Sequence, residues 1–401
     1  MNAIPRYRPH AGSPLLSIGF RPFFLLAALW AAIVVPLWVT LFGGNAELPT
    51  GLPPVIWHAH EMIYGYGVGV VAGFLLTAIP NWTGRMPLQG WPLAGLAALW
   101  LIGRAAVCGS AWIGPAAAAV CDLAFPVVFL GAILREILAG RNWRNLPMVV
   151  ALTLLLLGNL LVHLDAVGAA DTADIGNRLG IATLVMLINF VGGRIVPSFT
   201  RNWLARERPE VSSPASFGVL DRVVVALVAL ALLCWLLLPD SPIAPWVEVA
   251  GGLAVLVRLV RWRGEATWSE PLVWVLHLGY GWVAIGLLLL GVNAWLAALP
   301  ETTALHALTV GAIGTMTLAV MTRASLGHTG RPLTAGRGTT AIYVLIAAAA
   351  VLRLVAPLGA QHMTLLWLSA AAWSGAFGLF VVLFAKPLTA PRAVGDAVRP
   401  I

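Results

Sequence analysis

The chain has 401 residues, of which 60% are hydrophobic and only 10% are charged. A soluble domain carries about 25% charged residues, so this composition excludes an ordinary soluble protein and predicts an integral membrane protein. The formal net charge of +8 does not indicate a nucleic-acid partner, because the basic residues lie in the loops between apolar segments, where membrane topology explains them.

The first twenty residues, MNAIPRYRPHAGSPLLSIGF, are polar and lack an apolar stretch that ends in a small-residue cleavage site. No cleavable signal peptide is therefore expected, and the first span is expected to direct insertion. The three cysteines, Cys108, Cys121 and Cys234, form no CxxC or CxxCH motif. This excludes covalently attached haem c, and we interpret the cysteines as small apolar residues, with a contact between Cys108 and Cys121 at the ends of neighbouring helices as the open alternative.

Twelve segments are long and apolar enough to cross a membrane, which takes about 20 residues. In chain order the predicted spans are 23–42, 57–80, 91–108, 115–137, 146–165, 178–200, 219–238, 244–262, 271–293, 304–323, 340–357 and 363–385. The longest connection, 201–218, divides them into six spans within 1–200 and six within 219–390. The sequence predicts an all-α fold with a single polytopic membrane domain over 1–401.

The basic residues predict the orientation of these spans. With the N-terminus in the cytoplasm, 21 of the 24 lysines and arginines lie on the inner side, and only Arg104, Arg178 and Arg353 lie on the outer side. Inner loops of membrane proteins carry such an excess of positive charge. We therefore expect both termini in the cytoplasm.

A weak internal repeat links the ends of spans 2, 6 and 10. These spans end in IPNWT (79–83), VPSFT (196–200) and AVMTR (319–323), and all three are rich in glycine. The recurrence after every four spans predicts three four-helix units in which spans 2, 6 and 10 are equivalent.

Five of the eight histidines are predicted at similar depth near the outer face. They are His58 and His60 in span 2, His163 in span 5, His306 in span 10 and His362 at the start of span 12. His277 is predicted in the inner third of span 9, and His10 and His328 in the cytoplasm. Ionisable groups at such depth are costly and indicate a functional site. For His163 and His362, an interfacial position without further function is the open alternative.

The spacing of His58 and His60 makes them unequal. A helix turns by about 100° per residue, so these two side chains point about 200° apart. One helix face cannot present both to a single metal ion. His58 shares its face with Met62, and His60 shares its face with Tyr64, so one histidine is expected to bind a metal and the other a second centre or a hydrogen-bond partner.

Span 2 contains four glycines, which leave it without side chains at Gly65, Gly67, Gly69 and Gly73. Small residues allow close helix packing in membranes, and they also leave room for a flat macrocycle. A haem near the outer face has two propionates to neutralise. Arg104 and Arg353 lie late in spans 3 and 11 and are predicted to pair with them.

Four long segments resemble the NnrS family: GFRPFFLLAALWA (19–31), WHAHEMIYGYGVGVVAGFLLTAIPNWTGR (57–85), NFVGGRIVPSFTRNWL (189–204) and LHALTVGAIGTMTLAVMTRASLGHTGRPL (305–333). The similarity extends over the whole chain. The resemblance implies a twelve-span protein of the bacterial inner membrane that contains haem and copper and takes part in nitric oxide metabolism and protection against nitrosative stress.

The predicted repeat and the histidines of spans 2 and 10 also resemble the catalytic subunit of haem-copper oxidases and nitric oxide reductases. That resemblance implies a haem held by His58 or His60 together with His306. Those enzymes take further histidines from helices 6 and 7 for a second metal, whereas spans 6 and 7 here contain none. This difference argues against direct reduction of nitric oxide at a binuclear centre of that type.

The resemblance implies one or two haem b groups and makes copper a further candidate cofactor. Candidate proton donors or relays are Glu61, Tyr64, Tyr66 and Asn189, and candidate ligands of a second haem or a copper ion are His163, His277 and His362, with Met62 as a partner for copper. The expected partners are nitric oxide, membrane lipid and a quinol or other electron donor, without nucleic acid.

Two other classes of function remain as hypotheses. In the first, the chain is a transporter without redox chemistry, and intramembrane charges such as Asp122, Glu248 and Arg194 line its pathway. Alternatively it is a module that binds nitric oxide or transfers electrons without turnover. The sequence alone leaves open whether the protein is an enzyme.

Overall fold

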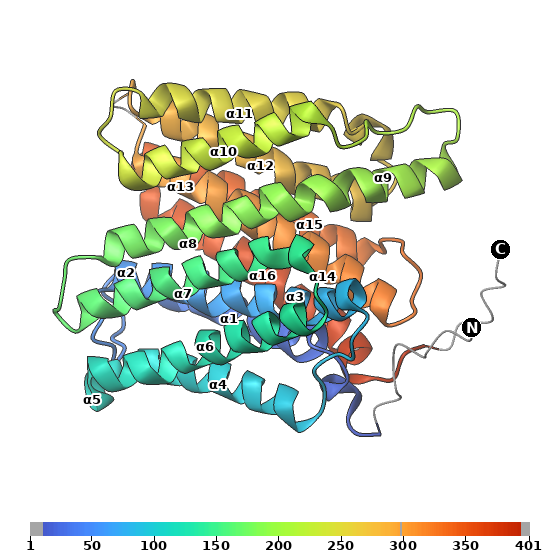
Figure 1. Ribbon diagram of the computed structural model, residues 1–401. Helices are drawn as coiled ribbons and strands as arrows, with labels where there is room; N and C mark the ends of the chain where they lie inside the picture. The colour runs from blue at the N-terminus through green and yellow to red at the C-terminus, as the bar shows by residue number, and fades with distance from the viewer. Residues whose placement is uncertain (1–10, 297–298, 394–401) are drawn as a thin grey trace. The chain divides into compact units, whose positions relative to one another are not determined.

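The computed structural model describes residues 11–296 and 299–393, and these residues form helices and connections without any strand (Figure 1). The predicted positions of both chain ends and of His10 fall outside the described residues. The contacts divide the chain into two compact units. Unit 1 comprises the described parts of Met1–Gly180, Ala324–Pro332 and Phe380–Ile401, and unit 2 comprises Ile181–Arg323 and Leu333–Leu379.

Unit 1 contains the first five predicted spans. Its elements are η1 (Pro14–Leu16), α1 (Phe20–Phe42), α2 (Pro54–His60), η2 (Glu61–Gly67), α3 (Val68–Thr83), α4 (Trp91–Cys108), α5 (Ser110–Ile113), α6 (Pro115–Ala139), η3 (Trp143–Asn145), α7 (Leu146–Ala166) and the first half of α8 (Ala173–Leu187). The ends of α14 and α16 complete it.

Unit 2 contains the remaining predicted spans. After the second half of α8, its elements are η4 (Ile188–Gly192), α9 (Gly193–Glu207), α10 (Val219–Leu237), α11 (Ala244–Val260), η5 (Gly264–Thr267), α12 (Pro271–Asn293), α13 (Glu301–His306), η6 (Ala307–Gly314), α14 (Thr315–His328), α15 (Arg337–Val355), η7 (Ala356–Leu358) and α16 (His362–Thr389).

Proline and glycine mark many of the helix ends. Proline lies in the first turn of α4 and α6, where its missing N–H leaves no hydrogen bond unmade. Gly84 ends α3 in a left-handed conformation with φ 72°, and its N–H donates to the carbonyl of Pro80. These residues explain why the observed boundaries lie within a few residues of most predicted spans.

Helices occur at all twelve predicted span positions, and eleven of them, among the described residues, are long and apolar enough to cross a membrane. The structure therefore confirms an all-α multi-pass membrane protein. The remaining segment, α11, has 17 residues and contains the buried Glu248 and Arg258. The count of twelve stays a prediction, since about 17 residues is the short limit for a span.

In the part of the chain that the structure describes, three of the long helices contain a π-helical segment. These segments are η2, η4 and η6, and they lie in the predicted spans 2, 6 and 10. π-Helical turns are rare and occur often at functional sites. Their recurrence in these three helices supports the predicted equivalence, and the threefold repeat itself stays a prediction.

Short connections place neighbouring helices against each other within each unit. In unit 1, α4 packs on α6, and in unit 2, α10 and α12 both pack on α11. Figure 1 shows α4 beside α6 and α10 beside α11. The first of these pairs brings two buried charged side chains together, as described next.

Candidate functional site

Six polar side chains meet in the interior of unit 1 and form what we call the buried polar cluster. They are His60 at the end of α2, Glu61 at the start of η2, Arg104 on α4, Asp122 on α6, and Asn159 and His163 on α7. None is more than 4% exposed. Because such groups lose their hydration on burial, they must satisfy one another.

Asp122 is the residue on which the buried polar cluster converges. Its Oδ2 atom lies 2.8 Å from Asn159 Nδ2, 2.9 Å from His163 Nε2 and 3.2 Å from His60 Nε2. Its Oδ1 atom accepts a hydrogen bond from Arg104 Nη2. One carboxylate therefore connects α2, α4, α6 and α7.

Glu61 forms the second anionic point of the buried polar cluster. Its Oε1 atom lies 2.7 Å from Arg104 Nη1 and 3.1 Å from His60 Nδ1, and its Oε2 atom accepts a hydrogen bond of 2.8 Å from Trp30 Nε1 on α1. Arg104 thus bridges two carboxylates, and His60 lies between the same two. This arrangement adds α1 to the helices that the cluster joins.

Two glycines make room for these contacts. A Cβ atom added at Gly65 would lie 2.8 Å from Arg104 Nη1 and 2.9 Å from Glu61 Oε2, and one at Gly103 would lie 2.7 Å from Asp122 Oδ1. The glycines at 69 and 73 similarly face Trp100 and Phe24. Gly65, Gly69 and Gly73 therefore allow close side-chain packing around span 2, and room for a macrocycle beside this span stays a prediction.

The charges of the buried polar cluster balance when His60 is an imidazolium. Glu61 and Asp122 contribute two negative charges and Arg104 one positive charge. Carboxylate oxygens only accept hydrogen bonds, so both ring nitrogens of His60 donate where they face Glu61 and Asp122. The resulting sum is zero, which is the condition for burying charged groups at tolerable cost.

His60, Asp122 and His163 also form a group with the donor set of a metal site. One ligand atom from each lies within 4.8 Å of the others, and all three residues are buried. Two imidazoles and one carboxylate are common ligands of divalent transition metals. His60 and His163 were predicted as metal ligands, and the structure brings these two together.

His58 lies in different surroundings from His60, as the helical spacing predicts. Its imidazole is half-buried and stacks on the indole of Trp38, with ring centroids 4.1 Å apart. His60 is fully buried, and its ring lies near Tyr64, with centroids 5.6 Å apart. Met62, the predicted partner for copper, is half-buried, and its role as a ligand stays a prediction.

His306, His362 and Arg353 belong to unit 2. His306 Nδ1 lies 2.6 Å from the carbonyl oxygen of Thr302, and His362 Nδ1 lies 3.0 Å from that of Ala356. The Thr303 hydroxyl reaches the carbonyl of Leu354 at 3.5 Å, so α13 and the end of α15 are neighbours. The pairing of His306 with a histidine of span 2 stays a prediction.

The other predicted residues lie apart from the buried polar cluster or at its margin. The hydroxyl of Tyr64 donates to the carbonyl of Gly176, at 2.5 Å, and Tyr66 is buried. Arg104 was predicted to face a haem propionate, and its guanidinium already faces two carboxylates of the protein. A propionate contact at Arg104 stays a prediction.

Asn189 belongs to a second set of buried polar groups, in unit 2. Its Oδ1 atom accepts hydrogen bonds from Tyr280 (2.7 Å) and Arg258 (3.1 Å), and Arg258 Nε donates to Asp221 at 2.9 Å. His277, which lies shortly before Tyr280 in the chain, is also buried, and its Nε2 atom lies 2.8 Å from the hydroxyl of Thr200. Within the described residues of unit 2, no group of three metal-type ligands accompanies His277.

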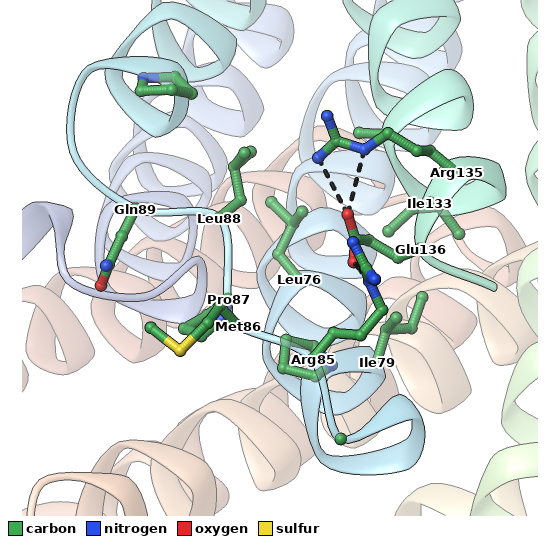
Figure 2. A pocket seen from close by; sticks show the side chains of 14 residues that line it. Leu76, Ile79, Arg85, Met86, Pro87, Leu88, Gln89, Ile133, Arg135 and Glu136 are labelled. Carbon is green, nitrogen blue, oxygen red and sulfur yellow. Dashed lines mark hydrogen bonds and ion pairs between the residues drawn. The ribbon is translucent and has the colours of Figure 1, made fainter. Parts of the chain in front are cut away.

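A pocket of about 540 Å³ opens at the other end of α3, between the connection to α4 and the last turns of α6. Figure 2 shows Arg85 and Arg135 converging on Glu136, with apolar side chains such as Leu76 and Ile79 around them. None of the residues predicted from sequence as ligands or proton relays lines this pocket. It is therefore separate from the buried polar cluster.

Sequence reasoning missed three members or supports of the buried polar cluster. Asp122 entered only as an intramembrane charge of a transporter, and Asn159 and Trp30 were not singled out. One signal was present, because Asn159 and His163 are four residues apart and share a helix face. A buried aspartate on the preceding span completes that pattern.

These observations define a helical multi-pass membrane protein with a buried ionisable centre that has metal-ligand character. The chain belongs to the NnrS protein family, whose model matches residues 14–392, nearly its full length. Family membership indicates a role in nitric oxide-related metabolism. The search of curated proteins finds no match.

Proposed function

We propose that this protein binds haem b in the bacterial inner membrane and acts there on nitric oxide. Membership of the NnrS family supports the role in nitric oxide metabolism. The observation that carries the haem proposal is the environment of His306, whose Nδ1 atom faces the carbonyl oxygen of Thr302 at 2.6 Å.

The residues of unit 2 fit a haem ligand set. A carbonyl only accepts, so Nδ1 of His306 donates, and this tautomer carries its lone pair on Nε2. Metal-binding histidines usually donate their second nitrogen to such a carbonyl or to a carboxylate. His362 has the same arrangement with Ala356, and Arg353 is the basic residue proposed for a propionate.

His58 is the proposed haem ligand of span 2. His60 is fully buried among the side chains of the buried polar cluster, whereas His58 is only half-buried, so His58 is the histidine of span 2 that we propose for the larger haem group. A bound haem supplies an iron that coordinates nitric oxide. The protein contributes ligands, polarity and access.

The test is an optical spectrum of the purified full-length protein, with and without nitric oxide. The His306→Ala variant is expected to lose most of its Soret absorbance, and nitric oxide is expected to shift the band of the unchanged protein. His328→Ala is the matched control, since His328 lies at the opposite end of the same continuous helix, Glu301–His328. Full haem content in folded His306→Ala protein overturns the ligand assignment.

A further inference from the structure

We propose that His60, Asp122 and His163 form a binding site for one divalent first-row transition-metal ion, separate from haem. The inference is independent of the proposed function, because it depends only on side chains within unit 1. The ligand atoms are the Nε2 atoms of the two histidines and Oδ2 of Asp122.

The separations of these atoms fit a metal ion. Imidazole and carboxylate ligands lie about 2.0–2.2 Å from Zn²⁺, so two ligands at tetrahedral or right angles to each other lie roughly 3 Å apart. In the structure, Asp122 Oδ2 lies 2.9 Å from His163 Nε2 and 3.2 Å from His60 Nε2. The two imidazole rings are nearly perpendicular, at 73°, with centroids 5.2 Å apart. Both rings therefore present Nε2 to the same carboxylate oxygen.

The residues that contact the three proposed ligands are also of the kind found around metal sites. His60 presents its other nitrogen, Nδ1, to Glu61 Oε1, and Arg104 holds the second oxygen of Asp122. Carboxylate–histidine–metal arrangements of this sort fix the ring and raise its basicity. Arg104 and Trp30 in turn fix Glu61. Each of these contacts uses atoms other than the three proposed ligand atoms.

The donor set limits the class of ion. Two imidazoles with one carboxylate suit Fe(II) and Zn(II), whereas Cu(I) prefers sulfur ligands, and none of the three proposed ligands is a sulfur atom. Asn159 adds an amide that faces both His60 and Asp122 at 2.8 Å. A divalent ion takes the place of the proton on Nε2 of His60, so binding releases that proton and changes the summed charge of the buried polar cluster from zero to +1.

The direct test uses Co(II) as a probe, because its visible absorption reports coordination. Full-length protein in detergent is treated with chelator, titrated with Co(II), and analysed for metal after gel filtration. We expect about one bound ion per chain, with d–d absorption bands, together with a melting temperature that rises with metal concentration. Anaerobic Fe(II) and Zn(II) titrations then compare the two candidate ions.

Variants distinguish a metal site from a hydrogen-bonded network that binds no metal ion. His163→Gln and Asp122→Asn are expected to weaken Co(II) binding more than tenfold, and Glu61→Gln is expected to weaken it by about 10–100-fold while the bands persist. Asp165→Asn is the matched control, since Asp165 lies two residues from His163 and contacts the loop residues Thr172 and Ala173.

Three outcomes overturn the proposal. The first is the absence of d–d bands and of retained metal in the unchanged protein. The second is equal Co(II) binding in Asp122→Asn and Asp165→Asn, and the third is unchanged Co(II) binding in His163→Gln. If Asp122→Asn fails to fold, the His163→Gln variant decides, because His163 lies at the edge of the buried polar cluster.

Discussion

At the scale of single residues, the buried polar cluster depends on the matching of opposite charges. Arg104 is 3% exposed and contacts the carboxylates of Glu61 and Asp122, which are 0% and 1% exposed. Removing one partner from such a group leaves an unpaired charge inside the protein. That loss typically costs about 3–5 kcal/mol, whereas an exposed ion pair is worth about 0–1 kcal/mol.

Replacing Arg104 with methionine is therefore expected to destabilise the protein strongly, by about 3–5 kcal/mol. The measurement is the free energy or apparent melting temperature of unfolding in detergent. Arg85→Met is the control, because the Arg85–Glu136 pair lies at the surface, with 43% of the Arg85 side chain exposed. Adding Glu61→Gln to Arg104→Met should recover part of the loss. Equal effects of Arg104→Met and Arg85→Met would contradict this account.

At the scale of elements, the π-helical segment η2 positions the first residues of the site. Glu61 begins η2 directly after His60 ends α2, so both side chains of the buried polar cluster from this helix lie at the junction. Gly65, inside η2, faces the Arg104–Glu61 pair closely enough to exclude a methyl group. The local helix geometry and the buried charges are therefore coupled.

The Gly65→Ala variant is expected to lose about 1–3 kcal/mol of stability, because the new methyl group displaces the guanidinium or the carboxylate. It should also lower Co(II) affinity, since Glu61 positions His60. Gly131→Ala provides a matched comparison in α6. No atom lies within 4 Å of a Cβ at that position, so a helix former there should be neutral or slightly stabilising. A harmless Gly65→Ala substitution would show that the close approach is unimportant.

At the scale of the whole molecule, the number of membrane crossings depends on α11. Its 17 residues include Glu248 and Arg258, both buried, and it packs between α10 and α12 within unit 2. The charge bias of 21 inner to 3 outer basic residues favours a crossing at this position. We therefore predict that α11 crosses the membrane.

Cysteine labelling tests this prediction directly. In a variant without Cys108, Cys121 and Cys234, a cysteine in place of Asp240 should react with an impermeant reagent from outside the cell. A cysteine in place of Arg263 should react only after permeabilisation. If both positions label from the same side, α11 does not cross, and the predicted orientation of one half of the chain is wrong.

Much of the fold could be predicted from the sequence because lipid imposes simple rules. A backbone in hydrocarbon must satisfy its own hydrogen bonds, so long apolar segments become helices. This reasoning located the twelve helical segments and the three glycine-rich helices, and the helical spacing predicted different surroundings for His58 and His60. Each of these depends on residues that are close together in the chain.

The composition of the buried polar cluster was decided only by tertiary structure. His60 lies 62 residues from Asp122 and 99 residues from Asn159 along the chain. No pattern of residues close together in the sequence predicts which helices become neighbours. The sequence alone determined that ionisable side chains enter the membrane region and therefore need partners. The packing of α2, α4, α6 and α7 determined which partners they have, because a buried charge is stable only where another helix presents its counter-charge.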